Sequence, residues 1–181
     1  MRKALLLSLF LLFTFSGVCN AEIYETNFEI AAGLYVPNEE GLLSTPELTL
    51  GYSFEVHESI HAKAFVSGYV LDPDDKYKTC DEDGSDFDKI PTISVGMSVL
   101  NYYNVGVTAD LYPEIGAYLT YQKIDYTKSG SGSVSDEKIG VGLLIGGGIR
   151  INQTFKASLH YRLQSSRVDD GGLSAEITLS F

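Results

Sequence analysis

The chain has 181 residues and carries 24 acidic against 13 basic side chains, a formal net charge of −11. This acidity argues against nucleic acid as a partner, because binding to nucleic acid needs clustered Lys and Arg that displace counterions. Only two cysteines occur in the whole chain, so a zinc site or a redox pair built from cysteine is not expected.

The N-terminus has the layout of a secretory leader. Arg2 and Lys3 precede the apolar run 4–15, and small or polar residues then lead to Ala21. A basic start, a short apolar segment and a small-residue exit are typical of a cleaved signal peptide and not of a membrane-spanning helix. The sequence therefore predicts cleavage after Ala21.

This prediction divides the chain into a signal peptide over 1–21 and a single mature domain over 22–181, a length typical of one domain. A lipid anchor at Cys19 is the alternative, which the bulky Val18 before it disfavours. After cleavage Cys80 is the only cysteine left, and it has no partner for an internal disulfide.

The rest of the chain is organised as strands with one apolar and one polar face. Apolar side chains fall on every second position, and Gly, Ser, Thr and scattered charges fall between them, which is the period of a β-strand. Eight such segments occur in chain order: 27–36, 47–56, 60–67, 93–109, 115–126, 138–151, 155–164 and 173–181.

The connections between these segments alternate in length, except at the last one, 168–171, which is short like 152–153 before it. Those at 37–46, 72–89 and 127–137 are longer, whereas 57–59 and 110–114 are tight turns. This asymmetry is typical of outer-membrane barrels, in which turns at the periplasmic end are short and loops at the cell surface are long. We interpret the unbroken parity of the fourth segment as one strand without a turn at its centre.

The pattern predicts an all-β fold, a closed eight-stranded antiparallel transmembrane β-barrel. Closure removes the open sheet edges that a bilayer does not tolerate. A soluble sandwich or lipocalin-like barrel is the alternative, but its outer face meets water and carries more charge. Here the face opposite the apolar one is rich in Gly, Ser and Thr, as a narrow polar lumen requires.

The last strand places Leu173, Ile177, Leu179 and the terminal Phe181 on one face. A final strand of this kind resembles the C-terminal assembly signal of outer-membrane barrels. The segments nearest to a motif are 143–150 and His160-Tyr161-Arg162. Together with them, the overall strand pattern resembles the small eight-stranded outer-membrane proteins, such as the OmpA transmembrane domain and OmpX, within the broader porin-like group. The resemblance covers residues 26–181.

The resemblance implies a bacterial outer-membrane location, with both ends of the mature chain in the periplasm. The partners that it implies are outer-membrane lipids, lipopolysaccharide and the barrel-assembly machinery.

Charged residues on the polar face are expected to form a network that fills the lumen, because an unpaired buried charge is unfavourable. The tight turn at 57–59 predicts a cross-strand pair of Glu55 with His61, and matching parity in the last two strands places Glu176 opposite Arg162 or Gln164. The predicted lumen network comprises Glu29, Glu55, His61, Lys63, Arg150, His160, Arg162 and Glu176, and Lys156 is expected to join the same polar filling. No cofactor or metal is expected.

Ser158, His160 and Glu176 are the residue types of a nucleophile, a base and an orienting acid. Lipid A deacylases of the PagL type resemble this arrangement, but they carry Ser two residues after the His, where this chain has Arg162. We therefore predict that the chain is not an enzyme.

The segment 72–89 is strongly acidic, and Asp81-Glu82-Asp83-Gly84 has the composition of a calcium loop without the spacing of an EF-hand. A solvated surface loop is the favoured interpretation. Residues 72–89 and 128–136 are predicted to be available to external ligands. The sequence thus favours a structural or surface-interaction role, with a narrow porin-like channel or a lipid A-modifying enzyme as alternatives.

Overall fold

The computed structural model describes residues 26–73, 86–87, 89–106, 109–128, 132–165 and 169–181. The predicted signal peptide and most of the acidic loop lie outside the described residues. The described part of the chain contains no helix that is long and apolar enough to cross a membrane.

Eight long strands and three two-residue strands make up the described fold. The long strands are β1 (Thr26–Pro37), β3 (Thr45–His57), β4 (Ile60–Pro73), β6 (Ile90–Asn101), β8 (Asp110–Lys128), β9 (Gly132–Arg150), β10 (Phe155–Gln164) and β11 (Gly171–Ser180). The short ones are β2 (Leu42–Leu43), β5 (Asp86–Phe87) and β7 (Tyr103–Asn104).

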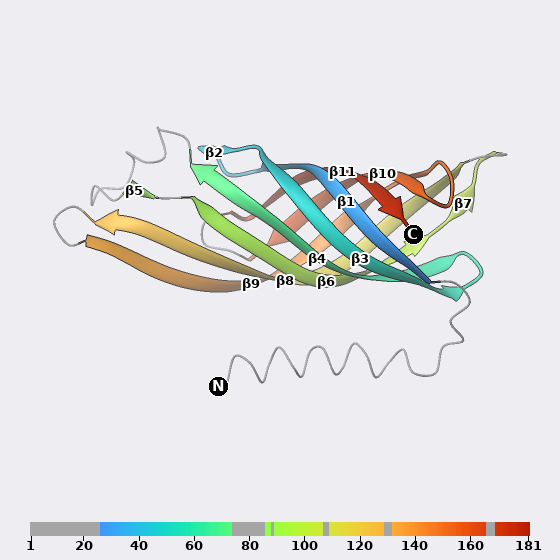
Figure 1. The fold of residues 1–181 in the computed structure, drawn as a ribbon, viewed down its shortest axis with the longest axis horizontal. Helices are drawn as coiled ribbons and strands as arrows, with labels where there is room; N and C mark the ends of the chain where they lie inside the picture. Colours follow the sequence, from blue (N-terminus) through green and yellow to red (C-terminus); the bar gives the residue numbers. More distant parts are fainter. Residues whose placement is uncertain (1–25, 74–85, 88, 107–108, 129–131, 166–168) are drawn as a thin grey trace.

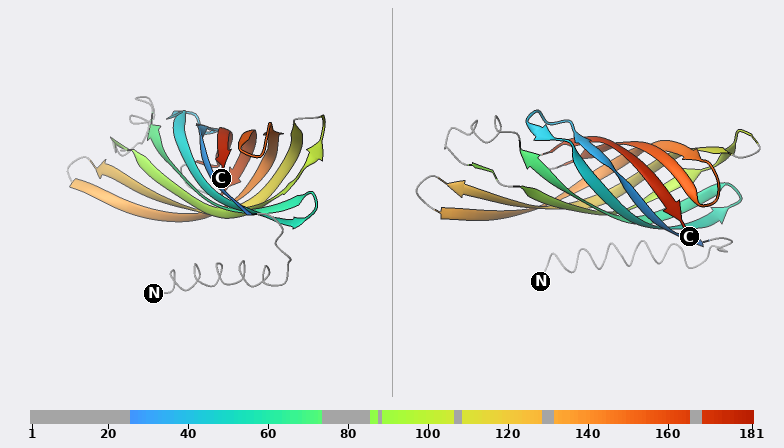
Figure 2. Two further views of the ribbon diagram at one scale, coloured as in Figure 1. Left: turned by 45° about the vertical axis from the view of Figure 1, so that its right-hand side comes forward. Right: turned by 45° about the horizontal axis from the view of Figure 1, so that its top comes forward.

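The eight long strands close into an antiparallel barrel, as Figures 1 and 2 show. Each pairs with its neighbours in the chain, and β1 pairs with β11 through a register that places Ile30 opposite Leu179. Phe181 extends this seam: its amide donates to the Phe28 carbonyl at 2.9 Å, and the Phe28 amide donates back at 3.1 Å. The predicted fold class is confirmed, and the last strand closes against the first.

We call the end of the barrel that carries Thr26 and Phe181 the terminal end, and the opposite end the hairpin end. The turns from β3 to β4 and from β9 to β10 also lie at the terminal end, because successive strands are antiparallel. The last strand runs from the hairpin end back to the terminal end (Figure 1).

The two faces of the wall are sorted as the alternation predicts. Large apolar side chains cover the outside; Ile115 and Val141 are each 61% exposed. Polar side chains fill the inside; Ser94 and Ser174 are fully buried. In a water-soluble barrel the apolar side chains face the inside, whereas here they face the outside. The medium around this barrel therefore has to be apolar, as the interior of a membrane is.

Two predictions about the fourth and fifth strands are wrong. The strand predicted over 93–109 ends at Asn101, and its predicted continuation pairs back onto β8 as β7, with Tyr103 opposite Leu111 and Asn104 opposite Asp110. The residues predicted as a turn, 110–114, instead begin β8. Pro113 sits within this strand opposite Gly147.

The connection predicted over 127–137 is also mostly strand. β8 and β9 have 19 residues each and pair from Asp110–Arg150 to Lys128–Gly132. A transmembrane β-strand needs about 9–11 residues, so this hairpin reaches well beyond the other strands (Figure 1).

Candidate functional site: the polar lumen

Eight buried side chains, basic and acidic in alternation, form a continuous series along the lumen that we call the chain of charges. Each lies within 4.0 Å of the next, and the members are, from the terminal end, Lys156, Glu29, Lys63, Glu114, His160, Glu176, Arg162 and Glu47. All are 6% exposed or less. The side chains come from β1, β3, β4, β8, β10 and β11, so the chain of charges ties most of the wall together.

Lys63 links the first two carboxylates. Its Nζ lies 3.6 Å from Glu29 Oε2 and 3.9 Å from Glu114 Oε1. Glu29 also accepts hydrogen bonds from Lys156 and from the Ser53 hydroxyl. The buried carboxylate of Glu29 is thus surrounded by two cations and a hydroxyl, which compensates for its removal from water.

His160 lies between two carboxylates at the centre of the lumen. Its Nε2 is 2.9 Å from Glu114 Oε2 and its Nδ1 is 4.0 Å from Glu176 Oε2. Glu114 also accepts a hydrogen bond of 2.5 Å from the Ser98 hydroxyl. The imidazole therefore joins the two halves of the chain of charges.

Arg162 neutralises the carboxylates nearer the hairpin end. Its Nη1 lies 2.6 Å from Glu47 Oε1, and its Nη2 lies 3.5 Å from Glu176 Oε1. Glu47 and Glu176 accept further hydrogen bonds from Ser174 at 2.6 Å and Thr49 at 2.9 Å. The predicted neutralisation of Glu176 by Arg162 is present, although Arg162 lies closer to Glu47.

The predicted strand register behind this pair is wrong. Glu176 stands opposite Ser158, and Arg162 stands opposite Gly172. The side chains still meet because the long guanidinium reaches along the barrel axis to a carboxylate that is not its direct cross-strand neighbour.

The other predicted network residues lie at the terminal end and outside the chain of charges. Arg150 pairs with Asp110 at 2.6 Å and stacks on Tyr102 at 4.0 Å. His61 is buried against the edge of Tyr102, with ring centroids 4.8 Å apart. Glu55 stands opposite His61 in the strand register, as predicted, and is half-buried near the rim.

Two members of the chain of charges, Glu114 and Glu47, are not among the residues predicted for the lumen, and Lys156 is expected only as part of its polar filling. Glu114 falls in the turn predicted over 110–114, directly after Pro113, although it shares the parity of the inward Gly116 and Tyr118. Glu47 and Lys156 lie on the polar faces of predicted strands. Their parity was visible in the sequence, but their partners come from strands more than 100 residues away.

Asp169 closes the lumen near the hairpin end. It is 1% exposed and accepts hydrogen bonds from the Tyr35 hydroxyl at 2.6 Å, the Gln164 amide at 3.0 Å and the Gly171 amide at 3.0 Å. Tyr35 in turn packs against Tyr69 at 4.4 Å. Asp169, just before β11, is therefore held inside the barrel mouth.

This arrangement of Asp169 is expected to depend on pH. Burial raises the pKa of Asp169 above its ordinary value, although hydrogen bonds from Tyr35 and Gly171 act in the opposite direction. A carboxyl with a higher pKa in the folded chain binds its proton more tightly there, so its contribution to stability falls as the pH rises above about 4.

We expect amide exchange in the β10–β11 connection, corrected for intrinsic rates, to be slower at about pH 4 than at about pH 7. Asp169→Asn should remove this difference, whereas Asp170→Asn, a change at the exposed neighbour, should keep it. An unchanged pH dependence in Asp169→Asn would contradict the assignment.

The three residues that suggested catalysis do not form a nucleophile–base pair. His160 Nε2 contacts Glu114, and Ser158 stands opposite Glu176 in the register. His160 is 2% exposed and enclosed by the lumen, so a lipid substrate outside the barrel would not reach it. Among the described residues, no group of His, Cys, Asp or Glu is arranged to hold a metal ion.

No family model and no curated protein matches the sequence. Among solved structures, the attachment invasion locus protein Ail of Yersinia pestis matches with a TM-score of 0.55 at 16% identity, over 86% of this chain and 95% of that chain. The N-terminal β-barrel domain of Pseudomonas aeruginosa OprF gives 0.51 at 13% identity, over 88% and 100%. The chain has the fold of the small outer-membrane barrels.

A second structure of Ail shares this fold and contains a ligand. Ail in complex with the heparin analogue sucrose octasulfate gives a TM-score of 0.51 at 14% identity, over 87% of this chain and 97% of that chain. A small outer-membrane barrel of eight strands has a lumen that side chains fill, as the chain of charges does here.

Proposed function

We propose that the protein is an integral outer-membrane barrel that presents its β8–β9 hairpin to proteins outside the cell. The projecting hairpin is the observation that carries this proposal. The terminal end faces the periplasm, and the assembly machinery reads Leu173, Ile177, Leu179 and Phe181 after the signal peptide over 1–21 is removed. The apolar outer wall contacts membrane lipid and lipopolysaccharide.

The hairpin offers a sheet edge for binding. The pairing of β9 with β10 ends at Gly142, whereas its pairing with β8 continues to Gly132. Among the described residues, no strand pairs with residues 132–139 on the side away from β8, and Ser165 reaches this edge where its amide donates to the Val141 carbonyl at 2.8 Å. An uncovered edge can add a strand from another protein through main-chain hydrogen bonds.

The charges on the hairpin favour a protein partner over a polyanion. Lys123 pairs with Asp125 at 3.0 Å and Lys138 with Asp136 at 2.9 Å, so these lysines are already neutralised. The chain as a whole carries a net charge of −11. Among the hairpin side chains that the structure describes, the sulfated ligand of the Ail complex would therefore meet no lysine without an acidic partner.

The lumen supports a structural role and not conduction. The chain of charges occupies its centre, and an apolar and aromatic cluster that includes Tyr35, Tyr69 and Leu71 fills it near the hairpin end. A wide aqueous path is absent from the described part of the lumen, and no described contact favours a channel or a lipid A-modifying enzyme.

The test uses intact cells that display the protein and a panel of immobilised matrix and serum proteins. In the test variant, residues 126–134 are replaced by Asn-Gly, which makes a tight two-residue hairpin and removes the projecting tip. We expect the wild type to bind at least one panel member and the shortened variant to lose that binding, while both keep heat-modifiable migration in detergent gels.

The matched control replaces Asn38, Glu39 and Glu40, which are exposed in the β1–β2 connection, by Ser. It should bind as the wild type does. Full binding by the shortened variant, or no binding by the wild type, would contradict the interaction role. Recovery of the protein in the soluble periplasmic fraction would contradict the membrane assignment itself.

A further inference from the structure

A small cavity lies at the terminal mouth of the lumen. It has a volume of about 160 Å³, roughly that of five water molecules in the liquid, and its lining residues are Asn27, Ser53, His61, Tyr102, Arg150, Gln153 and Lys156. Gln153 is exposed in the turn between β9 and β10, which places the cavity at the rim. Three of the lining side chains are basic, and none is a carboxylate. The cavity therefore has the size and the charge for a small anion.

Two of the basic side chains are direct cross-strand neighbours. Lys156 on β10 stands opposite Arg150 on β9, and the cationic groups of both lie over the Tyr102 ring, 5.7 and 4.0 Å from its centroid. His61 packs against the edge of the same ring, with 4.8 Å between centroids. Like charges directly opposite each other destabilise a sheet. An anion held between them would replace this repulsion by attraction.

The carboxylates beside these cations leave donors for a ligand. Among the described contacts, Arg150 donates to Asp110 from Nε and Nη2, at 2.9 and 2.6 Å, and Lys156 donates to Glu29. A guanidinium has five N–H bonds and an ammonium has three. The Arg150 Nη1 group and the remaining N–H bonds of Lys156 can therefore donate into the cavity.

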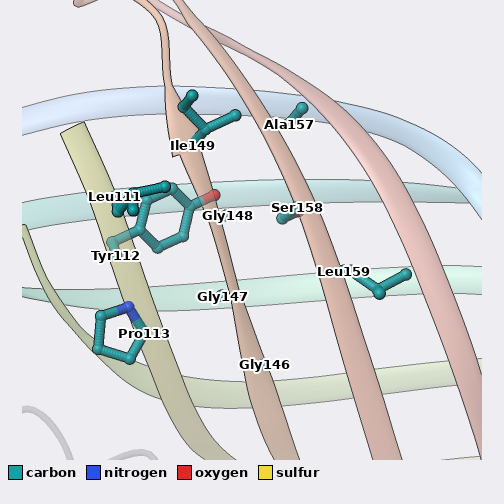
Figure 3. Close-up of a pocket in the computed structure, with 10 residues that line it drawn as sticks. All are labelled: Leu111, Tyr112, Pro113, Gly146, Gly147, Gly148, Ile149, Ala157, Ser158 and Leu159. Atoms are coloured by element: carbon teal, nitrogen blue, oxygen red, sulfur yellow. The ribbon is translucent and has the colours of Figure 1, made fainter. Parts of the chain in front are cut away.

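The Tyr102 ring that supports both cations is itself held in place. Its centroid lies 5.1 Å from that of Tyr112. Tyr112 lies across the backbone at Gly148 (Figure 3), where an added Cβ would come within 2.6 Å of the Tyr112 hydroxyl. The glycine thus leaves room for Tyr112, and Tyr112 backs Tyr102. A site built on a fixed ring loses little conformational entropy when a ligand binds.

We propose that this cavity binds one phosphate group, supplied as free inorganic phosphate or as the terminal phosphate of a small phosphomonoester. Its oxygens accept hydrogen bonds from Arg150 Nη1 and Lys156 Nζ, and His61 borders it from β4. A phosphomonoester carries about 1.5–2 negative charges at pH 7 and three acceptor oxygens, which match a cluster of basic groups better than the single charge of a carboxylate does. The site does not involve the β8–β9 hairpin, so its test is independent of the panel assay.

The test is a calorimetric titration of the folded mature protein in uncharged detergent, in a low-salt buffer that limits screening. Inorganic phosphate and glycerol 3-phosphate are titrated separately. We expect one saturable phosphate site with a Kd of about 1 mM or lower. Binding of both ligands would support a site that takes phosphomonoesters, and binding of inorganic phosphate alone would support a site for the free ion. No saturable heat and no shift in unfolding temperature with either ligand would overturn the proposal.

Two variants at the site should change the affinity in opposite directions. Arg150→Gln should weaken phosphate binding about tenfold, because a hydrogen bond from a charged donor is lost. Asp110→Asn should tighten it about threefold or more, because the carboxylate that competes for Arg150 loses its charge. A gain in affinity is not expected of a residue with only a structural role.

Lys89→Gln is the matched control, since it removes a cation from the exposed Lys89–Asp72 pair, and it should bind phosphate as the wild type does. Equal weakening by Arg150→Gln and Lys89→Gln would overturn the site, because the binding would then reflect the overall charge of the protein. Weaker binding by Asp110→Asn would overturn it as well.

Discussion

Arg162→Met is expected to lower the free energy of unfolding by about 3–5 kcal/mol, the usual effect of removing one partner from a buried ion pair. Arg162 is 2% exposed and is the nearest cation to both Glu47 and Glu176. The variant leaves two carboxylates in the lumen without that cation, and the methionine fills most of the vacated volume. The loss should therefore reflect charge and not a cavity.

The measurement is urea unfolding of the protein in lipid vesicles, followed by circular dichroism, because the chain has no Trp. Lys123→Met is the matched control, since it removes a cation from the exposed Lys123–Asp125 pair and should change stability far less than Arg162→Met does. The double variant Arg162→Met with Glu47→Gln should be more stable than Arg162→Met alone. Equal losses in the buried and exposed variants would mean that the lumen pair contributes nothing specific.

The barrel was predictable from sequence because strand alternation is a local signal. Each face of a strand such as β1 or β11 is visible in its own ten or so residues, and one face is apolar because it meets lipid. The ends of strands depend instead on where the chain pairs back on itself. The segment predicted as one strand over 93–109 reverses, so that Asn104 stands opposite Asp110, and the unbroken parity of the segment does not indicate this reversal.

The lumen contacts were predictable only by residue type. Parity identified Glu29, Lys63, His160, Arg162 and Glu176 as inward, and the structure brings these five into one chain of charges. Their order along the barrel axis depends on the pairing register between neighbouring strands. Parity fixes which face a residue is on, but registers that differ by two residues have the same parity. The prediction therefore gave Arg162 one of its two carboxylate partners and placed Glu176 opposite the wrong residue.

Glu114 is the lumen residue for which the sequence prediction failed most clearly. Proline usually marks a strand edge or a turn, so Pro113 led to a predicted turn that took Glu114 out of the lumen. In the structure Pro113 faces Gly147 on the outer wall, where a glycine leaves room beside the ring. The strand continues through this position, and its inward neighbour becomes the centre of the charge network.

Glu114→Ala is accordingly expected to destabilise the barrel by about 3–5 kcal/mol. The change removes the acceptor for Ser98 and His160 and leaves Lys63 and Lys156 to share the single carboxylate of Glu29. Glu114→Gln should lose less, because its amide oxygen still accepts a hydrogen bond from Ser98 or His160. The difference between the two variants separates the hydrogen bonds from the charge.

The contact of Glu114 with Lys63 can be isolated by a double-mutant cycle in the same unfolding assay. Lys63→Met alone leaves Glu114 with His160 as its nearest basic group, and Glu114→Gln alone leaves Lys63 with Glu29. Because each single variant strands a charge that the double variant removes, the summed losses should exceed the loss in the double variant by about 0.5–3 kcal/mol. Additive losses would show that the 3.9 Å separation carries no coupling and that the two halves of the lumen are stabilised independently.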